Sequence, residues 1–229
     1  MTEQLILDLA RPEPPTFANF VAGGNREALT ACAALALGQS RESGILLWGA
    51  PGVGKSHLLQ ATAKAATTAG RSVLFCSAPT DLATAGGATS SGLLIVDAID
   101  TADASAQAAL FTLVNGLAGQ GQWLAAASTP PARLSLRDDL RTRLALGLVL
   151  EIVALADADK PQALAAYARE RGFRLSDEVI EYLLAHGRRD MPSLVATLAA
   201  LDRLSLATKR GITVPLLREW LQRDLGLQR

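Results

Sequence analysis

Residues 49–57 read GAPGVGKSH, and they stand between the apolar run ILLW and a segment with the pattern of a helix. The spacing Gly49-x-x-x-x-Gly54-Lys55-Ser56 fits the phosphate-loop pattern in full. Glycines let such a loop turn its backbone N–H groups inward, because they adopt conformations that a Cβ forbids. The stretch therefore predicts a buried strand, a phosphate-binding turn and a helix that begins near Lys55.

Each part of this loop has a physical task in binding a nucleotide. The inward N–H groups form a nest for an anion, and the positive end of the helix dipole adds to it. Lys55 is expected to reach the β- and γ-phosphates, and Ser56 to ligate Mg²⁺. An ordinary glycine-rich turn would not require Lys-Ser at this offset. We predict that ADP or ATP binds here with Mg²⁺, in contact with Gly49, Pro51, Gly52, Val53, Gly54, Lys55 and Ser56.

The composition restricts the classes of function that this chain can have. Its 229 residues allow one large domain or two small ones. Lys and Arg together equal Asp and Glu, 22 of each, so no strong field favours nucleic acid. Aromatic residues make up only 4%, which argues against base-stacking platforms. We expect a cytoplasmic protein without membrane partners, because the sequence shows neither a signal peptide nor a long apolar run.

Short apolar runs alternate with helical patterns up to about residue 155. Continuous apolar strands separated by helices predict a parallel sheet that helices cover on both faces. The pattern predicts a tail over 1–15, an α/β nucleotide-binding domain with five parallel strands over 16–155, and an all-helical domain over 156–229. The expected strands cover 44–49, 72–76, 93–97, 123–128 and 146–153, and the expected helices include 25–38, 159–171, 176–187, 191–208 and 213–224.

A second nucleotide motif is LLIVDAID, residues 93–100. In a phosphate-loop protein, an apolar strand that ends in an acid holds Mg²⁺, and this assigns the role to Asp97. An Asp that caps the next helix is the structural alternative. The following Ala98 provides no second acid to polarise water, and Asp100 is the only nearby substitute. This absence predicts nucleotide binding with slow intrinsic hydrolysis.

Four stretches, taken with the phosphate loop, resemble AAA+ proteins and among them the DnaA initiator family. They are TFANFVAGGNREAL (16–29), GKSHLLQA (54–61), STPPARLSLRDDLRTRL (128–144) and GRRDMPSLVATLAALD (187–202). The resemblance implies a three-layer AAA+ domain followed by a small helical lid domain. In that family the first stretch packs near the adenine, so Asn19 and Phe20 are expected at the nucleotide. His57 follows the loop serine as in the family, and we assign it to the same site.

The resemblance also implies roles for polar residues of the last two stretches. Ser128 and Thr129 are the polar candidates for the sensor 1 position, where the family often has Asp or Asn, and this departure again weakens the case for self-hydrolysis. Arg189 matches the sensor 2 arginine, which contacts the phosphates from the lid, and Arg188 is its neighbouring alternative. Arg143 aligns with the arginine finger, which reaches the γ-phosphate held by a neighbouring subunit. Arg141 is the alternative finger, and a surface salt bridge from Arg143 to Asp138 or Asp139 is the structural alternative.

The tail contains QLILDL at residues 4–9, where alternate leucines would share one side of an extended strand. This hexapeptide is similar to the peptide that binds the bacterial DNA-polymerase sliding clamp. The resemblance implies clamp contacts through Gln4, Leu5, Leu7 and Leu9. An edge strand of the protein itself, or a tail with chance leucines, is the alternative.

From end to end, the chain resembles the Hda family of regulators that inactivate DnaA. The sequence stops without the DNA-binding domain of an initiator, and the connection 77–92 is too short for the helical insertion of initiators and loaders. The resemblance implies a negative regulator of replication initiation that docks on the DNA-loaded clamp, meets DNA only through it and stimulates ATP hydrolysis by DnaA, with a homodimer also allowed. A DNA-dependent helicase loader and a clamp-associated nucleotide-binding adaptor are the alternatives. Ala98 and the neutral charge argue against the loader, and Arg143 argues against the adaptor.

Overall fold

The computed structural model describes residues 14–83 and 92–224. The chain divides into two compact units: an α/β unit, Pro14–Ala154, and a helical unit that begins at Leu155. The tail hexapeptide and residues 84–91 of the connection before strand β3 lie outside the described residues. Within the described ranges, no helix is both long enough and apolar enough to cross a bilayer.

A five-stranded parallel sheet forms the centre of the α/β unit, as the apolar runs predicted. Its strands are β1 (Gly44–Trp48), β2 (Val73–Cys76), β3 (Leu93–Val96), β4 (Gln122–Ala127) and β5 (Leu148–Glu151), and they pair in the order β2-β3-β4-β1-β5. In register, Leu46 of β1 stands beside Ala125 of β4 on one side and Val149 of β5 on the other. Strand β1, which leads into the phosphate loop, is therefore buried between two neighbours.

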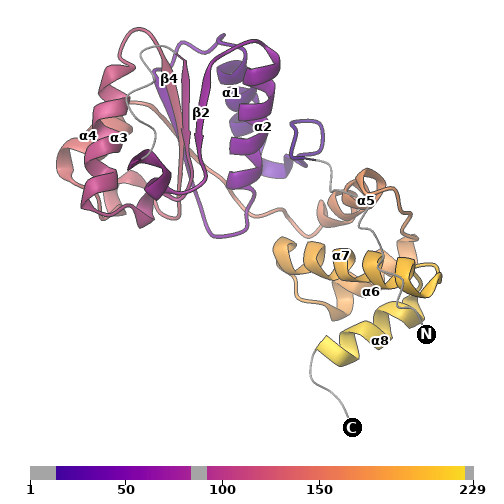
Figure 1. The fold of residues 1–229 in the computed structure, drawn as a ribbon. Coiled ribbons are helices and arrows are strands. Elements are labelled where there is room, and N and C mark those ends of the chain that lie inside the picture. Colours follow the sequence, from indigo (N-terminus) through magenta and orange to yellow (C-terminus); the bar gives the residue numbers. More distant parts are fainter. Residues whose placement is uncertain (1–13, 84–91, 225–229) are drawn as a thin grey trace, which may run out of the picture. The chain divides into compact units, whose positions relative to one another are not determined.

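Helices cover both faces of this sheet, so the unit has three layers (Figure 1). Helices α1 (Arg26–Ala36) and α2 (Lys55–Thr68) lie on one face, and α3 (Ala104–Gly116) and α4 (Asp138–Ala145) lie on the other. Side chains of β1 alternate between the two cores: Ile45 and Leu47 join the core beneath α1 and α2, and Leu46 joins the other. The carboxyl ends of the strands therefore carry the loops that position the site.

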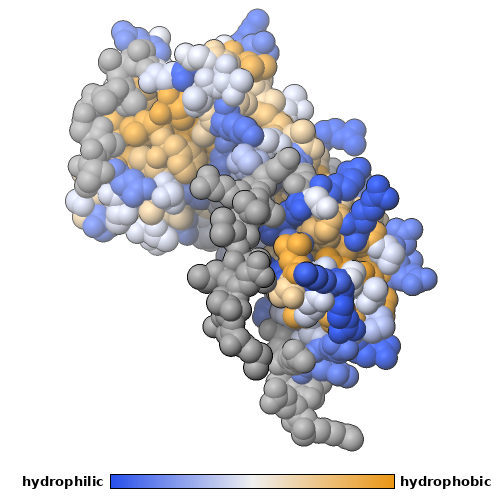
Figure 2. Space-filling view, turned by 45° about the vertical axis from the view of Figure 1, so that its right-hand side comes forward, coloured by the Kyte–Doolittle hydropathy of each residue, from blue (hydrophilic) through white to orange (hydrophobic). Residues whose placement is uncertain are grey.

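The helical unit contains α5 (Lys160–Glu170), α6 (Asp177–His186), α7 (Met191–Thr208) and α8 (Val214–Asp224), and its described residues contain no strand. Leucines from all four helices, such as Leu164, Leu183, Leu198 and Leu217, form a separate core. Asp190 caps α7 by accepting a hydrogen bond from the Ser193 N–H over 2.9 Å. Ser176 stands at the cap position of α6, but its side chain makes no cap bond. On the visible face, hydrophilic side chains stand among hydrophobic residues of this unit (Figure 2).

Candidate nucleotide-binding site

The phosphate loop connects β1 to α2 in a backbone conformation that requires glycine. Gly52 and Gly54 have φ values of 79° and 107°, which side chains of L-residues rarely adopt. A Cβ on Gly49 would lie 2.3 Å from the carbonyl oxygen of Ile152, so no larger residue fits there. The other predicted loop residues lie in the same turn, where Pro51 is exposed and Val53 packs, partly buried, against the core beneath α1 and α2.

Lys55 begins helix α2, and its ammonium group lies within the loop. It donates hydrogen bonds to the carbonyl oxygens of Gly49 and Ala50, at 2.6 and 2.9 Å. Burial lowers the pKa of Lys55, and the nearby carboxylates of Asp97 and Asp100 partly oppose this shift. The cation is thus held half-buried at the ends of the strands, beside a cradle that a Cβ would fill. These features fit the phosphates of a nucleotide.

Two oxygen ligands are available for a magnesium ion. Asp97 directly follows β3, and its Oδ1 accepts a hydrogen bond from the Ala98 N–H over 2.8 Å. Its Oδ2 makes no hydrogen bond with the residues described in the structure. Ser56, in the first turn of α2, is exposed. In the described ranges no group of three or more His, Cys, Asp or Glu side chains gathers. A single carboxylate with a hydroxyl suits Mg²⁺, which takes its remaining ligands from phosphates and water.

Asp100, the substitute acid of the sequence pattern, is paired with Ser128. The Asp100 carboxylate accepts hydrogen bonds from the Ser128 hydroxyl, at 2.6 Å, and from the Ser128 N–H, at 3.2 Å. Ala98 makes the intervening turn in a left-handed conformation, with a φ of 49°. The bonds join the ends of β3 and β4. Both residues belong to motifs of the sequence, but their spacing did not predict that they would meet.

The segment that leads into the α/β unit, residues 14–20, lies against the phosphate loop and the start of α2. The ring of Phe20 stands close to Gly54, where a Cβ would approach it to 2.9 Å. The same ring lies at 5.4 Å from the ring of His57, measured between centroids. Asn19 uses its side-chain amide within the segment, in a hydrogen bond with the N–H of Thr16. The structure places Phe20 beside Gly54 and His57, whereas the Asn19 side chain makes hydrogen bonds with Thr16 and Pro14. That these three residues contact a nucleotide stays a prediction.

Asn25 contributes to this region in a way that sequence analysis missed. It is 3% exposed and uses both atoms of its amide on the backbone of Val153. Its Nδ2 donates to the Val153 carbonyl over 2.9 Å, and its Oδ1 accepts from the Val153 N–H over 2.8 Å. The start of α1 is thereby joined to the chain just beyond β5. Asn25 belongs to the stretch 16–29 that resembles the DnaA family, but nothing in the sequence indicated that it would bond to Val153.

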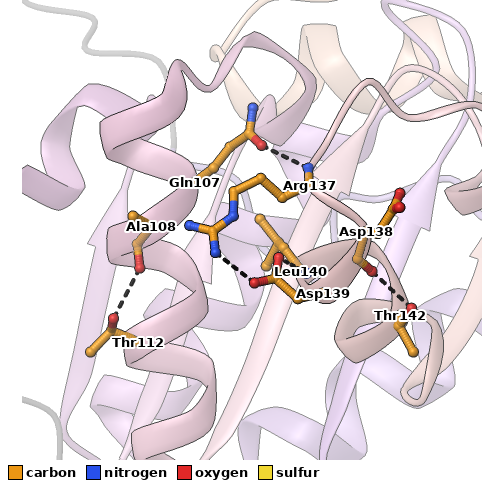
Figure 3. A network of polar contacts seen from close by, with 8 residues as sticks. All are labelled: Gln107, Ala108, Thr112, Arg137, Asp138, Asp139, Leu140 and Thr142. Atoms are coloured by element: carbon orange, nitrogen blue, oxygen red, sulfur yellow. Dashed lines mark hydrogen bonds and ion pairs between the residues drawn. The ribbon is translucent and has the colours of Figure 1, made fainter.

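Helix α4 is held firmly at its start (Figure 3). The Gln107 side chain, from α3, accepts a hydrogen bond from the Arg137 N–H over 2.9 Å. The Arg137 guanidinium group pairs with Asp139 at 2.6 Å and lies over the ring of Phe111, 5.8 Å from its centroid. These contacts fix the direction of the helix that carries the predicted arginine finger.

The two candidate arginines on α4 differ in their partners. Arg141 pairs with Asp138 at 2.7 Å, and Asp139 is engaged by Arg137. Arg143, in the last turn of the helix, is half-buried and makes no ion pair or hydrogen bond with any described residue. The structural alternative of a salt bridge from Arg143 to either aspartate is therefore wrong in this structure. Arg141 would have to break its ion pair with Asp138 to bind another anion, whereas Arg143 would not have to break any ion pair with a described residue.

In the helical unit, the predicted sensor 2 arginine lies in the turn between α6 and α7. The Arg189 guanidinium group is 76% exposed and stands 3.9 Å from Asp157. The Arg189 carbonyl accepts a hydrogen bond from the buried ammonium group of Lys160 over 2.7 Å. Lys160 also pairs with Asp157 at 2.6 Å and thereby lowers the pKa of that carboxyl. Lys160 thus fixes the turn that carries Arg189, and no sequence pattern indicated this role.

Comparisons with known proteins agree with this geometry. The family model of the Hda lid domain matches residues 157–221, and that of the bacterial DnaA ATPase domain matches residues 13–80. Domain III of DnaA from Thermotoga maritima has a similar structure, with a TM-score of 0.81, 20% identity and coverage of 93% of this chain and 97% of that one. AMPPCP-bound DnaA from Aquifex aeolicus gives a TM-score of 0.71 at 27% identity, with coverage of 85% and 67%.

A further solved structure shares the fold. The RuvB Holliday junction branch migration motor of Thermotoga maritima gives a TM-score of 0.70 at 18% identity, with coverage of 94% of this chain and 73% of that one. The phosphate loop, the strand order and the two family matches therefore lead to the same conclusion. The chain is an AAA+ protein related to DnaA, with a C-terminal helical region of the Hda lid type.

Proposed function

We propose that this protein is a nucleotide-bound regulator of replication initiation that stimulates ATP hydrolysis by a DnaA-type initiator. The observation that carries the proposal is Arg143, which has no partner among the described residues although the other arginines at this helix, Arg137 and Arg141, are both paired. An unpaired guanidinium group on a fixed helix is suited to an anion supplied by another molecule. The relation to DnaA favours a AAA+ neighbour as that molecule.

The nucleotide is ADP or ATP. The loop from Gly49 to Gly54 would surround its phosphates with backbone N–H groups, and Lys55 would exchange its two carbonyl partners for phosphate oxygens. Ser56 and Asp97 would hold Mg²⁺, which would supply positive charge to offset that of the phosphates. We assign Asn19, Phe20 and Ser128 to the same nucleotide site. Arg189 is assigned to phosphate binding because it matches the family's sensor 2 arginine.

Arg143 would act on the nucleotide of its partner. In the transition state of phosphoryl transfer, negative charge spreads over the oxygens of the transferred group, and a guanidinium group placed there stabilises it. In GTPases a finger supplied in trans accelerates turnover by roughly 10³–10⁵. The predicted slow hydrolysis by this protein itself is compatible with that role, since the chemistry takes place in the neighbour.

The tail would bring the protein to its place of action. We propose that Gln4, Leu5, Leu7 and Leu9 bind the sliding clamp as an extended peptide, so that the regulator meets initiators near clamp-loaded DNA. Support for this step comes from the sequence, because the peptide lies outside the described residues. A helicase loader remains the rival function, and it requires rapid DNA-stimulated hydrolysis by the protein itself.

The test is hydrolysis of ATP by the cognate initiator, measured with and without this protein, clamp and DNA. We expect stimulation only with the complete set, and we expect Arg143→Ala to remove it. Arg141→Ala is the matched control on the same helix, because it loses only an exposed pair with Asp138. Equal loss in both variants, or none in either, would refute the role of Arg143.

A further inference from the structure

His57 ties the start of helix α2 to the segment that leads into the α/β unit. Its Nε2 lies 2.9 Å from the carbonyl oxygen of Thr16, which stands 41 positions earlier in the chain. A carbonyl oxygen only accepts hydrogen bonds, so Nε2 carries the hydrogen and donates it. The His57 ring is half-buried and tilted by 54° against the ring of Phe20. His57, the residue directly after Ser56, thus contacts residues 14–20 through both Thr16 and Phe20.

The turn at Thr16 extends this one contact to the whole of residues 14–20. The Thr16 N–H donates to Asn19 Oδ1 over 2.7 Å, and the Asn19 N–H donates back to Thr16 Oγ1 over 3.2 Å. The Asn19 amide also donates to the carbonyl of Pro14 over 3.4 Å. Reciprocal bonds between side chain and backbone hold such a turn as a unit. The hydrogen bond from His57 to Thr16 therefore positions the whole turn, and not Thr16 alone.

Residues 14–20 contact the phosphate loop on both sides of Lys55 and Ser56. Phe20 lies against Gly54, the last residue before them, and His57 is the first residue after them. A ligand that orders the loop and the first turn of α2 would therefore order both contacts. The converse also holds, because a displaced segment would remove the wall that Phe20 forms beside the loop.

We propose that His57 is a positioning residue that couples nucleotide binding at the phosphate loop to the docking of residues 14–20. This inference rests on the proposed nucleotide function and extends it to the segment that directly follows the tail. Coupling between two equilibria is reciprocal: nucleotide stabilises the docked segment, and a loosened segment weakens nucleotide binding by the same factor. Nucleotide binding thereby increases the stability with which residues 14–20, the segment directly after the tail, are docked.

The test compares three variants of the full chain. His57→Phe keeps a ring against Phe20 but removes the donor, and His57→Gln retains an N–H donor. His186→Gln is the control, because the chain has only 2 histidines and the second lies in α6. Affinity for fluorescent ADP is measured together with hydrogen exchange of residues 14–20 in the presence and absence of ADP. We expect His57→Phe to bind ADP about fivefold more weakly and to lose the ADP-dependent protection, and His57→Gln to retain most of both.

A second substitution separates coupling from a general loss of structure. Thr16→Val removes the Oγ1 acceptor of the turn and should reproduce the effect of His57→Phe, and the double variant should be no weaker than either single one. Additive losses, or ADP-dependent protection that survives in His57→Phe, would overturn the inference while the nucleotide function stands. Failure of the wild-type protein to bind ADP would instead refute the nucleotide function, and the coupling with it.

Discussion

Replacing Asn25 should remove the two hydrogen bonds that join the start of α1 to the chain just beyond β5. The side chain is 3% exposed, and its amide makes two hydrogen bonds with the backbone of Val153, at 2.9 and 2.8 Å. Asn25→Ala leaves one N–H and one carbonyl without partners, and a buried polar group left unsatisfied costs about 1–3 kcal/mol. Val153 itself is 43% exposed, so water can reach part of its backbone. We therefore expect the free energy of unfolding to fall by about 2 kcal/mol rather than by twice that amount.

Asn25→Asp separates the loss of hydrogen bonds from a loss of packing, because it preserves the shape of the side chain. The carboxylate keeps an acceptor for the Val153 N–H, but it presents a second oxygen to the Val153 carbonyl and buries a charge. We expect Asn25→Asp to destabilise the unit more than Asn25→Ala. Thr30→Ala is the control on the same helix, since its hydroxyl bond to the Arg26 carbonyl is exposed and its loss should cost less than about 0.5 kcal/mol.

Urea unfolding followed by tryptophan fluorescence measures these differences. Trp48 and Trp123 lie in the α/β unit, and Trp220 lies in α8, so a Trp220→Phe background confines the signal to the unit of interest. The energy is taken from the shift in the urea midpoint at constant slope. If both Asn25 variants unfold with the wild-type midpoint, or if the aspartate is the milder change, the reasoning from hydrogen bonds is wrong.

Lys55→Ala should abolish stabilisation by ADP, which at about 100 times its dissociation constant is worth roughly 2.7 kcal/mol in the wild type. Thermal melts with and without ADP check this, and a wild type that shows no shift contradicts the nucleotide role. The isolated protein should hydrolyse ATP far more slowly than AAA+ motors, and Ala98→Glu should raise the steady-state rate; rapid DNA-stimulated turnover by the wild type would favour a loader. Changing Gln4 and Leu7 to Ala should abolish retention on immobilised clamp and leave nucleotide binding intact, whereas Arg143→Ala should leave clamp retention unchanged. A tail variant that the clamp still retains would refute the peptide interpretation.

The sheet was predictable because each strand carries its own signal. A parallel strand buried on both faces must be apolar throughout, and ILLW and LLIV are such runs. The strand ends were less predictable, since backbone pairing with neighbours decides them. The apolar run 146–153 shortens to β5 over Leu148–Glu151, and Gly147 just before it lies against the ring of Trp123.

The same distinction applies to the candidate site: features that depend on neighbouring residues were predictable, and contacts between distant residues were not. The phosphate loop and Asp97 depend on residues close in sequence, so spacing alone predicted them. Several polar pairs instead join distant positions within each unit. In the α/β unit Asn25 meets Val153 over 128 residues and Asp100 meets Ser128 over 28, and in the helical unit Lys160 meets the Arg189 carbonyl over 29. Such partners are fixed by the strand order and the loop paths, which no single segment encodes.

The conformation of Ala98 supports our proposal that this protein acts as a regulator rather than as a motor. An L-residue in the left-handed region costs roughly 1–2 kcal/mol, and such strain persists where the surrounding structure requires a particular chain path. Here the path carries Asp100 to the end of β4, where its carboxylate is held by the hydroxyl and N–H of Ser128. The acid therefore joins two strands, and the position directly after Asp97 has no carboxylate to polarise water. We therefore expect this site to keep a nucleotide rather than to hydrolyse it, and we propose that the guanidinium group of Arg143 on α4, unpaired among the described residues, serves a nucleotide held by a neighbouring molecule.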